Sequence, residues 1–146
     1  MGAVCEMLLY AASRAEHVRQ TIRPALEAGI HVVCDRFVDS SIVYQGYGRQ
    51  LGAQLVAQTN APAVDGLVPD LTFLLLVDEA TVQSRRNATE KDRLELEHED
   101  FFARVRQGYQ DLLKAGEPRL VPIDANGTIE QVHERILAAF LERASL

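Results

Sequence analysis

Residues 31–46 read HVVCDRFVDSSIVYQG, and this stretch gives the clearest indication of how the chain folds. The β-branched run 31–34 predicts a short buried strand, and Asp35 and Arg36 follow it directly. In an α/β sheet, ligands bind beyond the carboxyl ends of the strands, so this charge pair is a candidate site. An arginine at such a position can hold a phosphate through a two-pronged hydrogen bond.

Apolar residues at helical spacing predict one long helix before that stretch, over about residues 5–28. Gly29 is a natural stop for this helix. Pro24 lies inside the pattern and predicts a kink or a break near residues 22–23, because proline removes a backbone donor.

Shorter helical segments are expected after the Asp-Arg pair. Either Asp39 or Ser40 can cap a short helix that runs to about Tyr44. Another helix is predicted over residues 53–59, with an interruption at 60–62, where the sequence is Asn-Ala-Pro. Loops are expected at three glycines, namely Gly46, Gly48 and Gly52.

Strands and helices alternate in the rest of the chain. Residues 71–77 are nearly all apolar, which is typical of a strand buried on both faces of a parallel sheet. A third strand is predicted over 120–124. Helices are predicted over 80–86 with Asp78 as cap, over 101–113 ending at Gly116, and over 128–141. Such alternation predicts an α/β chain with a parallel sheet and right-handed crossovers.

Length and composition limit the possible functions. The 146 residues, 47% of them hydrophobic and 25% charged, predict a single folded domain over residues 1–146. A net charge of −6 argues against a general nucleic-acid or membrane-surface binder. The sequence shows no basic signal-peptide region and no apolar run of membrane-spanning length, so we expect a cytoplasmic setting. Cys5 and Cys34, the only cysteines, have no metal-ligand spacing and suggest reducing conditions.

Several short motifs follow one another in a specific order: Leu8-Leu9-Tyr10-Ala11-Ala12-Ser13-Arg14, Asp35-Arg36-Phe37 with Ser40-Ser41, Tyr44-Gln45-Gly46-Tyr47-Gly48-Arg49, Pro69-Asp70-Leu71 and Asp92-Arg93-Leu94-Glu95. In this order the chain resembles the thymidylate kinase family of P-loop nucleoside monophosphate kinases. The resemblance runs from about Glu6 to the C-terminus. It implies a three-layer parallel sheet of the P-loop NTPase kind. It also implies Mg²⁺-dependent transfer of the γ-phosphoryl group of ATP to dTMP, giving dTDP, and a homodimer formed through the first helix.

The resemblance assigns the dTMP site to residues on both sides of the Asp-Arg pair. Tyr10 would stack on the thymine ring, and Arg14, four residues on and therefore on the same helix face, would donate to an oxygen of the base. Arg36 would hold the phosphate of dTMP. The family uses an aromatic residue near the sugar to exclude a 2′-hydroxyl. The residues that would surround the sugar and base are Ser40, Ser41, Tyr44 and Gln45.

Other readings of the same residues remain open at this point. Tyr10 could be a core aromatic residue and Arg14 a solvated helix residue. The two serines could cap a helix. Asp35 and Arg36 could form a structural ion pair with each other.

The resemblance also assigns the phosphate-donor side. Asp35 would act as a Walker-B-like acid that positions Mg²⁺ or its waters. The lid would be residues 85–97, where mobile arginines can close over the charge of the transferring phosphoryl group. Arg86 and Arg93 would be catalytic and Arg85 would contact ATP, although each of them, like Lys91, could also be a solvated surface charge. Ala125 and Asn126 match the place where the family's adenine ring rests, largely against backbone.

One expected motif is absent from the 146 residues: they contain no glycine-rich loop with Gly-Lys-Ser/Thr. In the resembled family, strand 1, the P-loop and strand 2 precede the part matched here. Strand 1 lies between the strands expected at 31–34 and 71–77. We therefore expect a truncated fold that carries the dTMP side and is inactive or poorly active alone, and a missing N-terminal fragment could act as a partner. The alternatives are a non-catalytic thymidine-nucleotide-binding or interaction module, or another deoxynucleotide kinase.

Overall fold

A computed structural model describes residues 1–86 and 99–144 of the chain, without the side chains of 83–86 and 144. The chain divides into two compact units. Unit 1 consists of Met1–Val68 and His98–Gln110, and unit 2 consists of Pro69–Glu97 and Asp111–Leu146. Each unit is described by itself.

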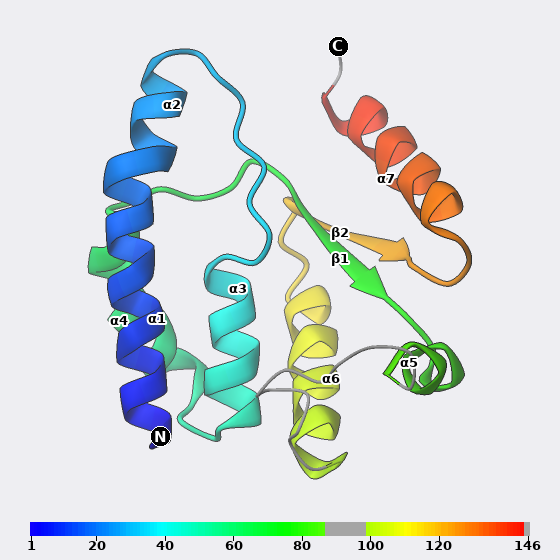
Figure 1. Cartoon of the computed structure of the whole chain (residues 1–146), viewed down its shortest axis with the longest axis horizontal. Coiled ribbons are helices and arrows are strands. Elements are labelled where there is room, and N and C mark those ends of the chain that lie inside the picture. Colours follow the sequence, from blue (N-terminus) through cyan, green and yellow to red (C-terminus); the bar gives the residue numbers. More distant parts are fainter. Residues whose placement is uncertain (87–98, 145–146) are drawn as a thin grey trace. The chain divides into compact units, whose positions relative to one another are not determined.

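The described residues of unit 1 are helical or irregular, and none forms a strand. Its elements are α1 (Ala3–His17), η1 (Val18–Ile22), α2 (Arg23–Glu27), α3 (Val38–Ser41), η2 (Ile42–Gly48), α4 (Ala53–Val64) and the larger part of α6 (Glu99–Lys114) (Figure 1). The segments η1 and η2 are π-helical, so their turns are one residue wider than α-helical turns.

The first three elements form one continuous helical stretch with a change of hydrogen-bonding pattern inside it. The π-helical segment η1 ends at Ile22, and Pro24 stands in the first turn of α2. A proline is tolerated there because the first turn does not use its missing N–H. The backbone stays helical at residues 22–23, so a change of hydrogen-bonding pattern stands in place of the kink or break predicted there. The stop at Gly29, which has a φ of 74°, is confirmed.

The short helix after the Asp-Arg pair differs from the prediction in two ways. It begins at Val38 after Phe37, and neither Asp39 nor Ser40 caps it with a side-chain hydrogen bond. It also continues as η2 through Gly46 and Gly48, which are therefore not loop residues. Close packing accounts for these glycines, because a Cβ on Gly48 would lie 2.6 Å from the ring of Phe101. Only the loop at Gly52, with a φ of 88°, is confirmed.

Helix α4 is longer than predicted, because it does not stop at the Asn-Ala-Pro triplet but continues to Val64 with Pro62 inside it. Tertiary packing outweighs the cost of the proline here. Val56 is fully buried, and Asn60 is 1% exposed with its amide nitrogen donating to the carbonyl of Val56 at 2.8 Å. The helix ends at Asp65, whose backbone is left-handed.

The strand expected at residues 31–34 is not formed. The segment is irregular, Val33 is 99% exposed and Ile30 is 59% exposed. An extended segment becomes a strand only by hydrogen bonding to a neighbouring strand. None of the described residues pairs with this segment, so the local β-branched pattern has nothing to complete it.

Unit 2 contains the sheet. Strands β1 (Thr72–Leu76) and β2 (Leu120–Asp124) pair in parallel, with Thr72 opposite Leu120 and Leu76 opposite Asp124. The parallel pairing is as predicted, but the described sheet has two strands where a larger three-layer sheet was expected. Leu75 is 54% exposed, so β1 is not buried on both faces, which corrects the prediction for residues 71–77.

The helices of unit 2 are α5 (Glu79–Arg86), the end of α6, and α7 (Ile129–Ala144). Asp78 caps α5 as predicted, since its carboxylate accepts a hydrogen bond from the N–H of Thr81 at 2.7 Å. Helix α7 packs on β2.

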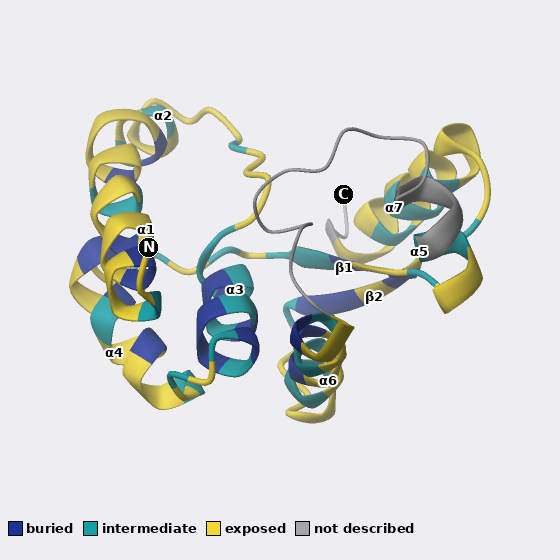
Figure 2. Cartoon of the chain, turned by 60° about the horizontal axis from the view of Figure 1, so that its bottom comes forward, coloured by how far each residue is buried: buried dark blue, intermediate teal, exposed yellow. Residues whose placement is uncertain are grey.

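The core of each unit lies on the inner faces of these elements (Figure 2). In unit 1, α1 packs against α4 and η2. The buried apolar side chains there include Met7, Ala11, Val18, Ile22, Val43 and Val56. In unit 2 they are Leu74, Leu120, Val121, Ile123 and Ala125. None of the described helices has both the length and the apolar character needed to cross a membrane.

Candidate functional site

Arg14 joins three segments of unit 1. From α1, its guanidinium donates to the hydroxyl of Ser41 at 2.8 Å and to the backbone carbonyl of Phe37 at 3.1 Å. It also donates to the side-chain carbonyl of Asn60 on α4. Burial lowers the pKa of Arg14, and the nearby Cys34 opposes that shift. An arginine held by three acceptors is fixed in direction, so it is not a freely solvated helix residue.

The Asp-Arg pair lies at the exposed side of the same cluster. Arg36 is exposed, and its Cζ lies 5.0 Å from the centroid of the Tyr44 ring. Its backbone has a φ of 63°, a left-handed conformation that is costly for residues other than glycine. Such strained positions cluster at functional sites. Asp35 is also exposed and makes no ion pair with Arg36 in the part of the chain that the structure describes.

Tyr109 of α6 adds a second aromatic hydroxyl to this cluster. Its oxygen lies 3.5 Å from the hydroxyl of Ser40. Burial raises the pKa of Tyr109, and the neighbouring Tyr44 and Asp39 raise it further, while Ser40 and Arg36 lower it. Tyr109 therefore stays a neutral hydroxyl near neutral pH.

Gln45 lies deeper than the other predicted sugar and base contacts. It is 2% exposed, and its amide donates to the carboxylate of Glu6 at 3.0 Å. Arg49 donates to both oxygens of the same carboxylate at 3.1 Å, and its guanidinium lies over the ring of Phe101. The amide of Gln45 therefore serves packing between α1 and η2, and a direct contact with a nucleotide stays a prediction.

Tyr10 is 44% exposed on α1, four residues before Arg14. An aromatic ring on the surface at this position is free to stack on a planar ligand. The exposure excludes the reading of Tyr10 as a core aromatic residue.

The structure thus brings Arg14, Ser40, Ser41, Tyr44 and Arg36 into one connected cluster of unit 1. Glu6, Phe37, Arg49, Asn60 and Tyr109 were not predicted as part of it. Their partners are far away in sequence, since Asn60, for example, lies 46 positions after Arg14, so no local pattern indicates them. Buried polar residues on otherwise apolar helix faces, such as Glu6, are the only sequence signal that could have found them.

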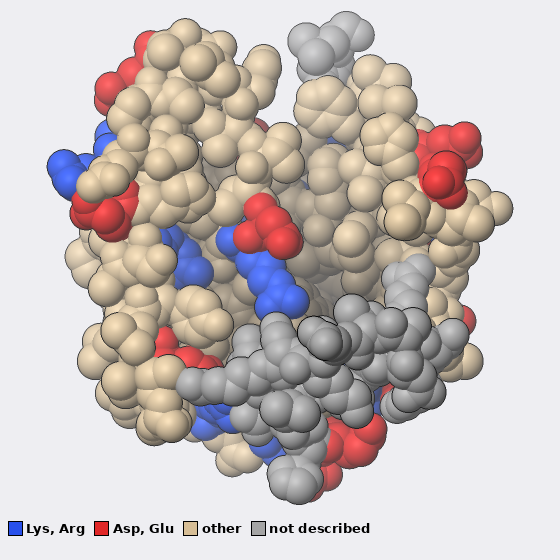
Figure 3. All heavy atoms as spheres, viewed as in Figure 1, with Lys and Arg blue, Asp and Glu red and all other residues tan. Residues whose placement is uncertain are grey.

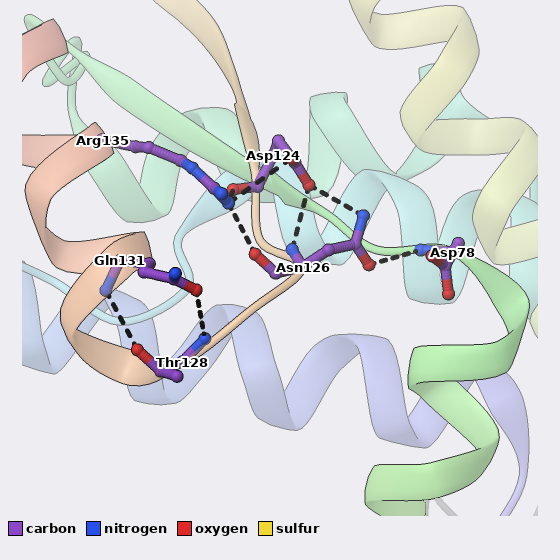
Figure 4. Close-up of polar contacts among 6 residues, drawn as sticks. All are labelled: Asp78, Asp124, Asn126, Thr128, Gln131 and Arg135. Carbon is purple, nitrogen blue, oxygen red and sulfur yellow. Dashed lines mark hydrogen bonds and ion pairs between the residues drawn. The ribbon is translucent and has the colours of Figure 1, made fainter.

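A second candidate feature lies at the carboxyl end of the sheet in unit 2 (Figure 4). The carboxylate of Asp124 accepts from the backbone N–H of Asn126 at 3.0 Å and from its side-chain amide at 2.8 Å. The side-chain carbonyl of Asn126 accepts from the N–H of Asp78 at 3.2 Å, which ties the loop to the end of β1. Arg135 of α7 donates to the backbone carbonyls of Asp124 and Asn126 at 2.7 and 2.6 Å.

This loop places the predicted adenine contacts in a defined conformation. Ala125 is 3% exposed, and its N–H donates to the carbonyl of Leu76 at 2.8 Å. The backbone N–H groups of both Ala125 and Asn126 are thus engaged within the protein. The N–H of Asn126 lowers the pKa of the Asp124 carboxyl below its usual value, and Arg135 contributes in the same direction.

The remaining predicted residues fall outside what the structure describes. Arg93 and Lys91 lie among residues 87–98, and Arg85 and Arg86 lie in α5 with undescribed side chains. Among the described residues, no group of three or more His, Cys, Asp or Glu side chains could hold a metal ion. On the described part of the face in Figure 3, acidic and basic side chains occur in small separate groups among uncharged atoms.

The sequence of the chain is similar to sequences of known proteins. The family model described as thymidylate kinase matches residues 2–136. The chain is 46% identical over 139 residues to a thymidylate kinase of Exiguobacterium sp., which covers 94% of this chain and 66% of the relative. It is 47% identical over 142 residues to a thymidylate kinase of Trichodesmium erythraeum, covering 94% of this chain and 61% of the relative. The chain thus spans 61–66% of the length of these curated relatives.

The fold is also similar to that of a solved structure. The crystal structure of thymidylate kinase from Ehrlichia chaffeensis matches with a TM-score of 0.74 and 32% sequence identity. The match covers 96% of this chain and 65% of that chain. It extends over both units, including the helical unit that carries the Arg14 cluster.

Proposed function

Because the chain belongs to the thymidylate kinase family, we propose that it carries the dTMP-binding part of a thymidylate kinase. The complete reaction would transfer the γ-phosphoryl group of ATP to the phosphate of dTMP and give dTDP. The observation that supports this proposal best is the fixed guanidinium of Arg14 between Ser41 and Asn60, in the unit where the exposed Arg36 lies over the ring of Tyr44.

The roles of the acceptor residues follow from their chemistry. Tyr10 would offer its exposed ring for stacking on thymine. Arg14, already held in direction, would donate one more hydrogen bond to an oxygen of the base, which discriminates thymine from cytosine because the amino group of cytosine cannot accept. Arg36 would hold the phosphate, since guanidinium groups bind phosphate oxygens in pairs. Tyr44, under the Arg36 guanidinium, would crowd the 2′ position of the sugar, with Ser40 and Ser41 close by.

Mg²⁺ fits this site only in a limited way. The described residues offer Asp35, an exposed carboxylate next to Arg36, and no cluster of ligands around it. Magnesium is commonly bound by one or two carboxylates together with substrate phosphates and waters, so Asp35 would contribute one ligand beside the bound phosphates. The bound ion would neutralise phosphate charge.

Fewer of the residues that would bind ATP, the phosphate donor, are present in this sequence. The 146 residues contain no Gly-Lys-Ser/Thr loop, so ATP would need a P-loop that is not among them. The loop at Ala125 and Asn126 would contribute a surface for the adenine ring, and Arg85, Arg86 and Arg93 would lie over the phosphates. We therefore propose that this chain alone binds dTMP but is inactive or poorly active as a kinase.

A homodimer through α1 belongs to the same proposal. Val4, Leu8 and Leu9 are each more than half exposed on this helix, which suits a second copy of the chain. Light scattering of the purified chain tests this part separately.

Calorimetric titration of the purified chain with dTMP, dCMP and ATP tests the main proposal, with circular dichroism on the same sample. Saturable dTMP binding, weaker dCMP binding and no ATP binding are expected. A folded chain that binds none of the three contradicts the proposed dTMP site.

An activity assay then separates an enzyme part from a binding module. The chain would be joined to the part of the Exiguobacterium relative that lies outside the matched region. Formation of dTDP from ATP and dTMP by the fusion, and not by either piece, is expected. A fusion that binds dTMP and ATP but forms no dTDP would instead favour the non-catalytic module.

A further inference from the structure

The carboxylate of Glu6 is nearly sealed inside unit 1, at 3% exposure, on a helix whose outer face is solvated. It accepts hydrogen bonds from the amide of Gln45 at 3.0 Å and from both ends of the Arg49 guanidinium at 3.1 Å. A buried carboxylate is unfavourable unless it is paired and hydrogen-bonded. The buried Glu6 carboxylate therefore depends on partners that include Gln45 and Arg49.

The two partners belong to one structural element. Gln45 lies in the middle of η2, and Arg49 is the residue that ends it. In an α-helix each backbone N–H donates to the carbonyl four residues earlier, whereas in η2, over Ile42–Gly48, the partner lies five residues earlier. π-Helix is rare, occurs mostly as single turns inside α-helices, and is frequently found at functional sites. Glu6 thus bonds to residues in the middle and at the end of η2, a π-helical segment that depends on contacts with other parts of the fold.

The same two helical segments carry the candidate nucleotide residues. Glu6, Tyr10 and Arg14 are spaced by four on α1 and share one face of the helix. Arg14 bonds to Ser41, at the start of η2, while Glu6 bonds to its middle and end. Two sets of polar contacts therefore join α1 to residues 41–49: Arg14 bonds at the start of this segment, and Glu6 bonds toward its end. Tyr44 lies in sequence between Ser41 and Gln45, which make these contacts, and its ring lies under the Arg36 guanidinium.

We propose that Glu6 is a positioning residue of the acceptor site. It holds η2 in its π-helical register on α1, and this register keeps the ring of Tyr44 against the Arg36 guanidinium. Without the carboxylate, η2 would return toward α-helical pairing. The residues after Ser41 would then rotate about the helix axis, and the ring of Tyr44 would leave the Arg36 guanidinium. The inference rests on the proposed function in that it takes dTMP as the ligand of this site.

The test compares Glu6→Gln with Glu16→Gln in the full chain. Both changes remove one charge from α1, but Glu16 is half exposed and, among the described residues, bonds to Arg19 and Gln20 of the adjoining η1. For each variant, calorimetry gives the dissociation constant for dTMP and the number of sites per chain. A purely structural defect lowers the number of competent sites, whereas a positioning defect raises the dissociation constant of molecules that are still folded.

For Glu6→Gln we expect a dissociation constant at least tenfold higher with an unchanged number of sites, and for Glu16→Gln a change of less than twofold. An unchanged dissociation constant in Glu6→Gln, or a loss confined to the number of sites, overturns the inference. If Glu6→Gln does not fold, Arg49→Lys takes its place, because it keeps the charge and loses the two-pronged contact. For Arg49→Lys we also expect a higher dissociation constant for dTMP, with a smaller increase than for Glu6→Gln.

Amide hydrogen exchange without nucleotide provides a second readout. We expect faster exchange in residues 42–49 of Glu6→Gln, and no such change in Glu16→Gln. If the unaltered chain does not bind dTMP, the proposed function fails, and exchange alone decides whether Glu6 holds η2. Unchanged exchange in residues 42–49 would then overturn the inference as well.

Discussion

The guanidinium of Arg36 lies over the ring of Tyr44, 5.0 Å from its centroid, while the Arg36 backbone is held in a left-handed conformation. Arg36 therefore combines a strained backbone with a favourable contact between its guanidinium and an aromatic ring. The contact between cation and ring is worth about 0.5–1 kcal/mol at an exposed site, and the left-handed backbone costs about 1–2 kcal/mol.

Replacing Arg36 by glycine separates these two contributions. We expect Arg36→Gly to leave the free energy of unfolding within about 1 kcal/mol of its original value, because relief of backbone strain offsets the lost contact. The dissociation constant for dTMP should rise at least tenfold. Gln50→Gly is the matched control, since Gln50 also has a left-handed backbone, with a φ of 60°, and is exposed. It should keep dTMP affinity, and equal affinity in both variants would contradict a phosphate-binding role for Arg36.

Arg14→Ala should affect both stability and selectivity. The hydroxyl of Ser41 and the side-chain carbonyl of Asn60 lose their donor, so the free energy of unfolding should fall by about 1–3 kcal/mol. The affinity for dTMP should fall more than the affinity for dCMP, because Arg14 is proposed to donate to the base. Urea denaturation and paired titrations measure the two effects. Arg19→Ala, which removes an exposed arginine of the neighbouring π-helical turn, should change neither by a measurable amount. Equal losses for both nucleotides in Arg14→Ala would indicate a structural role only.

A third prediction concerns unit 2 and should leave nucleotide binding by unit 1 untouched. Thr128 and Gln131 form a reciprocal cap at the start of α7, with the Thr128 hydroxyl accepting from the Gln131 N–H at 3.3 Å and the Gln131 side chain accepting from the Thr128 N–H at 3.0 Å. Thr128→Ala should lower the free energy of unfolding by about 1 kcal/mol. Helical signal by circular dichroism during denaturation measures this loss. A Thr128→Ser variant, which keeps the hydroxyl, should retain most of the stability.

The pH dependence of stability should reflect the carboxylates at the end of the sheet. Hydrogen bonds from Thr81 lower the pKa of Asp78, and the Asn126 N–H lowers that of Asp124, each below an ordinary value of 3.8. A lowered folded-state pKa stabilises the fold above the ordinary value, and this contribution is lost as the pH falls through the lowered value. Thermal unfolding between pH 6 and pH 2.5 should therefore show a smaller acid-induced loss in Asp124→Asn than in the unaltered chain. The same slope in both would contradict the assignment.

How much the sequence predicts depends on whether the evidence is local. The strand at 120–124 and the cap at Asp78 follow from patterns within a few residues, and the structure has both. The strand expected at 31–34 depends on a neighbour, and without one among the described residues the pattern stays unpaired. The sequence predicts loops at Gly46 and Gly48, but they are helix residues that leave room for Ala53 and Phe101.

The same difference between local and distant evidence applies to the candidate site. Tyr10, Arg14 and the Asp-Arg pair are predicted as site residues because they belong to short motifs. The residues that hold them were not found, since Glu6 meets Arg49 across 43 positions of sequence. Such pairings arise when helices pack, and a single sequence does not record which helices meet.

Helix α6 has one further consequence for the molecule as a whole. Its residues up to Gln110 belong to unit 1, and those from Asp111 onward belong to unit 2. The polypeptide therefore changes units after Val68, after Glu97 and again within this helix. A single protease cut, or a single recombination point in the gene, cannot separate the two units intact.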